Sequence, residues 1–112
     1  MTDKLFTIDN IEVTKSIIKT YISDYNYVNI YHSTLGGNDN ISIILIISLD
    51  KKEDWQNNIL ENSRYIKLHI DNTGYIELCS QSHDLKLFRA GQCKSICKLT
   101  DKIRRQIKIR EA

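Results

Sequence analysis

The chain has 112 residues, of which 41% are hydrophobic, which is enough for one domain spanning residues 1–112 with a single core. Its longest apolar run, residues 43–47, is far shorter than the roughly 20 residues that cross a bilayer, so the sequence predicts no membrane anchor. The net charge is +2, but residues 85–112 hold nine cations against two anions, whereas residues 1–84 hold seven against twelve. This division predicts an electrostatic partner for the basic end.

The compartment follows from the N-terminus and the cysteines. Residues 1–4 lack the pattern of a signal peptide, which begins with positive charge and continues with an apolar stretch. Three cysteines cannot all pair within one chain. We therefore expect a protein of the reducing cytoplasm.

In chain order, the first predicted element is a helix over residues 11–25, introduced by Asp9 and Glu12 in the spacing of a capping box. Its core-facing stripe has helical spacing and consists of Ile11, Ile18, Tyr21, Ile22 and Tyr25. Residues 27–34 alternate as a strand does, and a Gly36-Gly37 turn leads to a central strand over residues 41–49. The first half therefore predicts a helix followed by a hairpin.

The second half begins with another capping pattern, Asp50 with Glu53, which predicts a short helix that ends near Ser63. A second hairpin is expected from residues 64–70 and 75–80, because both segments alternate and flank a turn that contains glycine. Residues 85–89 predict a further short strand, which Gly91 ends before a last helix. The order α-β-β-α-β-β-β-α indicates an α+β domain in which helices pack on a mostly antiparallel sheet.

The last helix, over residues 95–109, carries the main candidate binding surface. Its apolar stripe, at spacings of three and four, consists of Ile96, Leu99, Ile103 and Ile107. A basic ridge is expected opposite this stripe, and it consists of Lys94, Lys98, Lys102 and Arg105, with Arg104 and Lys108 as flanking residues. Like charges one turn apart destabilise a helix slightly, which favours a role in binding anions. Cations near a helix C-terminus also complement the helix dipole, so a merely solvated face stays open.

Two groups of residues offer possible metal or acid–base chemistry. Cys79, His83, Cys93 and Cys97 suit tetrahedral zinc in number and kind, but they lack the glycine-bearing knuckle of structural sites. Ordinary partly buried cysteines are the favoured interpretation, and we predict no metal and no cofactor. The segment Tyr31-His32-Ser33-Thr34-Leu35 resembles half of the paired His-x-Thr/Ser signature of the 2H phosphoesterases, with His69-Ile70-Asp71 as the later candidate half.

Residues 51–110 are similar in element order to a double-stranded-RNA-binding domain, with Gly91, Lys94 and Lys98 near the start of the last helix. They lack the alanine-rich final helix and the paired lysines of that family. In a broader way Trp55, residues 58–65, Phe88-Arg89 and Lys94-Ser95-Ile96 resemble small accessory proteins of phages and plasmids. That resemblance implies a stoichiometric inhibitor similar in role to anti-CRISPR proteins.

Three function classes follow, and the first is preferred. It is a non-catalytic protein that binds and inhibits a host protein or nucleoprotein complex that handles nucleic acid or serves in defence. The first alternative is direct DNA or RNA binding by the basic helix face of Lys94, Lys98, Lys102, Arg105 and Lys108. The second alternative is a small phosphoesterase-like enzyme, for which only the two histidine segments argue.

Overall fold

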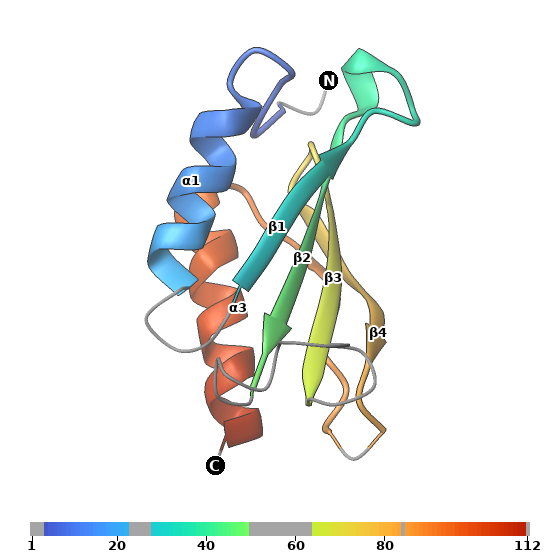
Figure 1. Ribbon diagram of the computed structural model, residues 1–112. Coiled ribbons are helices and arrows are strands. Elements are labelled where there is room, and N and C mark those ends of the chain that lie inside the picture. Colours follow the sequence, from blue (N-terminus) through green and yellow to red (C-terminus); the bar gives the residue numbers. More distant parts are fainter. Residues whose placement is uncertain (1–3, 23–27, 50–63, 84, 112) are drawn as a thin grey trace.

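The computed structural model describes residues 4–22, 28–49, 64–83 and 85–111. These residues form a five-stranded antiparallel sheet and two α-helices (Figure 1). The helices are α1 (Ile11–Ile22) and α3 (Ile96–Glu111). The strands are β1 (Val28–Ser33), β2 (Ser42–Ser48), β3 (Tyr65–Asp71), β4 (Tyr75–Gln81) and β5 (Gly91–Gln92), and a short 3-10 helix, η1 (Asn38–Asn40), precedes β2. The predicted α+β class is confirmed.

The strands are paired in chain order, β1-β2-β3-β4-β5, and every pairing is antiparallel. The β1–β2 turn and the β3–β4 turn each contain a glycine with positive φ, Gly37 at 91° and Gly74 at 93°. At Gly74 the close approach of another segment adds a second requirement, because a Cβ there would collide with the carbonyl oxygen of Cys93. The turn therefore locks the β3–β4 hairpin to the segment that leads into α3.

Both helices lie on one face of the sheet, and α1 packs against α3 and β1 (Figure 1). The strand residues beneath them alternate with outward residues, as a half-covered sheet requires. Those inward residues are fully or almost fully buried: Ile43, Leu45, Ile47, Ile66, Leu68, Ile70 and Ile76. From the helices, buried aliphatic side chains at helical spacing complete the same core, as the two predicted stripes require: Ile11, Ile18, Ile22, Leu99, Ile103 and Ile107.

The strand predicted over residues 85–89 is wrong, because a side chain binds the backbone of this segment. Gln81 Nε2 donates to the carbonyl oxygen of Leu85 at 2.8 Å, and Gln81 Oε1 accepts from the Phe88 N–H at 3.2 Å. Phe88 enters the core, and strand pairing begins only at Gly91, which the sequence had suggested as a breaker. The helix predicted between Asp50 and Ser63 lies outside the described residues, as do Tyr25, Tyr27 and Trp55.

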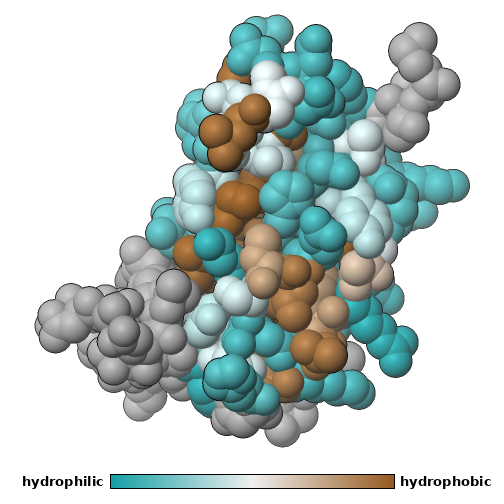
Figure 2. Space-filling model, turned by 90° about the vertical axis from the view of Figure 1, so that its right-hand side faces the viewer, coloured by the Kyte–Doolittle hydropathy of each residue, from teal (hydrophilic) through white to brown (hydrophobic). Residues whose placement is uncertain are grey.

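The side of the molecule away from the two helices shows separate hydrophobic patches between hydrophilic residues (Figure 2). Its outward strand positions include Tyr31, Ile44, His69 and Glu77, which pair across β1, β2, β3 and β4. Leu87, in the segment after β4, is 71% exposed. This face mixes aromatic, aliphatic and charged groups, so it forms no continuous surface of one chemical kind.

Candidate binding surface

The orientation of α3 follows from its apolar stripe. Leu99 and Ile103 are fully buried, Ile107 is 1% exposed, and Ile96 packs at the edge of the core. The Ser95 hydroxyl caps the helix by accepting a hydrogen bond from the Lys98 N–H at 3.1 Å. Since the stripe faces the sheet, the opposite side of the helix must face solvent.

Three of the five predicted binding residues, Lys98, Arg105 and Lys108, lie on that opposite side, and Lys94 lies two residues before the helix; we call these four cations the basic face. All four are exposed. Among the described residues, no carboxylate forms an ion pair with Lys94, Lys98 or Lys108. Arg105 Nε lies 3.4 Å from the carbonyl oxygen of Asp101, one turn earlier. The positive charge of this face is therefore available to an external partner.

Lys102 departs from the prediction, because its side chain turns away from the solvent ridge. Its Nζ lies 5.7 Å from the centre of the Phe88 ring, within the range of a cation–π contact. The same ammonium also approaches the backbone at Gly91. Lys102 is half-buried and ties α3 to the segment beside β5, so its role in the structure is intramolecular.

A shallow depression runs along the basic face and is lined by Asp101, Arg104, Arg105 and Lys108. Arg104 is half-buried on the flank of α3. The lining is largely cationic, with one carboxylate among three cations. Such a surface attracts anionic groups, and its shallow form suits a macromolecular partner better than an enclosed small molecule.

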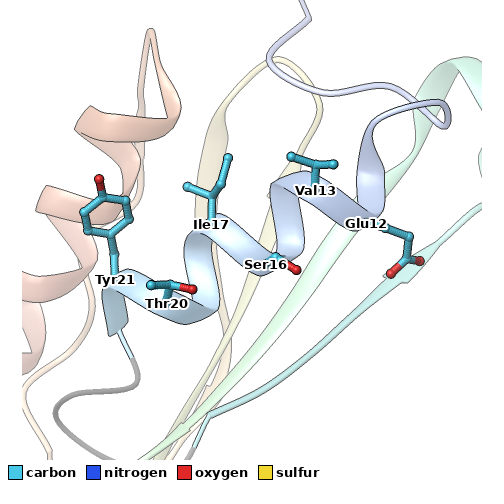
Figure 3. Close-up of a pocket in the computed structure, with 6 residues that line it drawn as sticks. All are labelled: Glu12, Val13, Ser16, Ile17, Thr20 and Tyr21. Atoms are coloured by element: carbon cyan, nitrogen blue, oxygen red, sulfur yellow. The ribbon is translucent and has the colours of Figure 1, made fainter.

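The second surface, on the outside of α1, was not recognised in the sequence. Val13, Ile17 and Tyr21 are 63%, 40% and 53% exposed, and together with Glu12, Ser16 and Thr20 they line a shallow depression (Figure 3). We call the first three the apolar stripe of α1. Tyr21 had been predicted on the core face, which is wrong. The signal was present in the spacing of four residues from Val13 to Ile17 and from Ile17 to Tyr21.

The two candidate histidines do not meet. His32 pairs with Ile43 in the register, on the helix side of the sheet, and Lys15 Nζ donates to its Nδ1 at 2.8 Å. His69 pairs with Ile44, on the opposite side of the sheet, and its Nδ1 lies 3.6 Å from Glu77 Oε1. Two histidines on opposite faces cannot act as acid and base on one substrate.

The four potential zinc ligands also remain apart. In the described part of the chain, no three histidine, cysteine or carboxylate side chains gather as a metal site would require. Cys79 and Cys97 are exposed, and Cys93 is buried beside the Gly74 turn. Burial raises the pKa of the Cys93 thiol, against the opposing effect of the positive charges of Lys102, Arg105 and Lys98.

No known protein family matches this chain, and neither does any curated protein or solved structure. Within the described residues, every helix is too short or too polar to cross a membrane. The basic face and the apolar stripe of α1 are the two candidate binding surfaces among the described residues.

Proposed function

We propose that the protein is a non-catalytic binding protein that inhibits a cytoplasmic complex handling nucleic acid or serving in defence, and that it does so as a product of a phage or other mobile element. The observation that carries this proposal is the basic face of α3, whose lysines make no ion pair within the described chain. Exposed like charges cost a helix some stability, which favours a use for this surface outside the fold.

The geometry of the basic face supports a broad contact. Within α3, Lys98 and Lys108 are separated by a helical rise of about 15 Å, with Arg105 between them, and Lys94 extends the row of cations before the helix begins. A complementary acidic surface would gain both steering and orientation from such a row of charges. The two histidines lie on opposite faces of the sheet, which further favours binding over catalysis.

The test is affinity capture from a bacterial lysate by three immobilised proteins. The first is the wild type, and the second carries Lys98→Glu, Arg105→Glu and Lys108→Glu. The third is a control in which the exposed Lys19, Lys86 and Arg89 are replaced by glutamate, so that the net charge changes equally. We expect a stoichiometric protein partner with the wild type and the control, and its loss with the basic-face variant.

Two results would contradict the proposal. The first is that the wild type recovers no protein partner. The second is that all three proteins recover the same partner in the same amount, which would place the contact away from the basic face.

Direct nucleic-acid binding is the second candidate, favoured by the same row of cations along one helix. Each phosphate neutralised would lower log K by about 0.9 per log unit of salt for duplex DNA. Gel-shift titrations of the wild type and the basic-face variant at two salt concentrations measure this slope. If the wild type binds neither DNA nor RNA at low salt, the second candidate is excluded.

A further inference from the structure

The outer surface of the helical layer combines two features of different chemistry. One is the apolar stripe of α1, formed by Val13, Ile17 and Tyr21, and the other is the basic face of α3. Both helices lie on the same face of the sheet and pack against each other (Figure 1). The contacts of Lys15 and Lys102 determine how each helix is rotated, and hence whether the apolar stripe lies beside the cations.

Lys15 fixes the orientation of α1. Its Nζ contacts His32 Nδ1 on β1, the strand at one edge of the sheet. Ile17 is two residues later, which places it about 200° around the helix from Lys15. The apolar stripe therefore lies on the flank away from the β1 edge, on the side where α3 packs. Figure 3 agrees, since α3 is drawn beside the Tyr21 end of α1.

Lys102 fixes the orientation of α3 in the same way. Its ammonium contacts the Phe88 ring and approaches Gly91, which belongs to β5 at the other edge of the sheet. Arg104, two residues later, lies about 200° around the helix and hence on the flank toward α1. Arg104 and Lys108 line the shallow depression on this helix. The apolar stripe and the cationic depression therefore border one continuous surface.

We infer that this joint surface binds an acidic amphipathic helix of the partner protein. The inference rests on the proposed function and specifies its partner. A ridge of apolar side chains at i, i+4 and i+8 matches the packing of a second helix against α1. The cations of α3, on one side of that ridge, complement carboxylates on the corresponding flank of the incoming helix.

Charge and apolar area together favour an acidic amphipathic helix over a nucleic acid, a second copy of the chain or a membrane. A nucleic acid would use the cations but leave Val13, Ile17 and Tyr21 in water. A second copy of the chain would bring two basic faces close together, which is unfavourable. A membrane surface calls for a wider apolar face than three side chains provide.

The test measures fluorescence anisotropy with a synthetic labelled peptide of about 18 residues, with leucines at i, i+4 spacing and glutamates along one flank. A scrambled peptide of the same composition is the control probe. One protein variant carries Val13→Ser and Tyr21→Ser, since these residues and serine have similar helix propensities. Its matched control carries Leu87→Ser and Tyr75→Ser, which removes an exposed aliphatic group and an exposed tyrosine elsewhere.

We expect the amphipathic peptide to bind about tenfold more tightly than the scrambled one. We expect the Val13/Tyr21 variant to lose about tenfold in affinity, the size of effect seen when an energetically important interface residue is truncated. The Leu87/Tyr75 control should bind as the wild type does. Equal binding of both peptides, or no effect of the Val13/Tyr21 variant, would overturn the inference. So would binding of an RNA or DNA oligonucleotide, or of anionic phosphatidylglycerol vesicles, that is tighter than peptide binding.

The same variants separate this inference from the proposed function. If affinity capture recovers a partner that the Val13/Tyr21 variant retains and the basic-face variant loses, the proposed function stands and the amphipathic helix is wrong. If capture recovers no partner at all, the proposed function itself fails.

Discussion

The two helices are alike on the inside and different on the outside. Each docks on the sheet through aliphatic residues at helical spacing and also buries one threonine, Thr14 in α1 and Thr100 in α3. The Thr14 hydroxyl donates to the Asn10 carbonyl at 3.0 Å, and the Thr100 hydroxyl donates to the Cys97 carbonyl at 2.9 Å. Outside, α1 presents an apolar stripe and α3 presents cations. Docking therefore constrains the inner faces alike, and the outer faces are left to differ in binding chemistry.

The largest expected effect comes from the shared inner faces. Ile18→Ala and Ile103→Ala should each lower the free energy of unfolding by about 2–5 kcal/mol, because both side chains are fully buried and would leave cavities. Urea unfolding followed by circular dichroism measures the change. Ile17→Ala, in the apolar stripe of α1, is the control and should lower the free energy of unfolding far less. A loss at Ile17 as large as at Ile18 would show that the stripe belongs to the core.

A smaller effect distinguishes Lys102 from the basic face. Lys102→Gln should lower the free energy of unfolding by about 0.5–1 kcal/mol, because it removes the cation from the Phe88 ring. Urea midpoints of the wild type, of Lys102→Gln, of Phe88→Leu and of the double variant form a double-mutant cycle. Additive losses in that cycle would show that the ammonium and the ring do not interact.

The basic face should respond in the opposite direction. Lys98→Gln should raise the free energy of unfolding by about 0.2–0.5 kcal/mol, since it relieves the like-charge pair with Lys102, one turn later in α3. The gain should shrink at high salt, because screening weakens the repulsion in the wild type. Thermal unfolding at low and high salt tests this. A clear loss of stability at both salt concentrations would mean that Lys98 has an intramolecular partner.

The smallest effect concerns the thiols on and beside α3. The exposed Cys97 should react with Ellman's reagent before the buried Cys93, whose pKa is raised by burial. Since the folded-state pKa of Cys93 lies above the unfolded value of about 8.5, its stabilising contribution is complete below that pH and is lost as pH rises through the folded-state pKa. Urea midpoints at pH 7 and pH 9.5 should therefore differ less in Cys93→Ala than in the wild type. An identical pH dependence in both proteins would contradict this assignment.

Much of the fold could be predicted because its signals are local. Alternation identified β1 to β4, and helical spacing identified α1 and α3 with the buried residues Ile18, Leu99 and Ile103. The failures have a common cause. Residues 85–89 alternate as a strand does, but the side chain of Gln81 holds their backbone groups. Hydrogen bonds from a side chain in another segment produce no periodic pattern in the sequence of the segment that they hold.

The candidate surface shows the same division. Periodicity alone places Lys98, Arg105 and Lys108 away from the apolar stripe of α3, because rotation per residue is a property of the helix itself. Lys102 and Tyr21 could not be placed in this way, since Phe88 attracts one and the packing of α1 on its neighbours exposes the other. The chain's local pattern sets which residues can share a helix face. Contacts between distant segments select which flank of that face is covered and which is left for a partner.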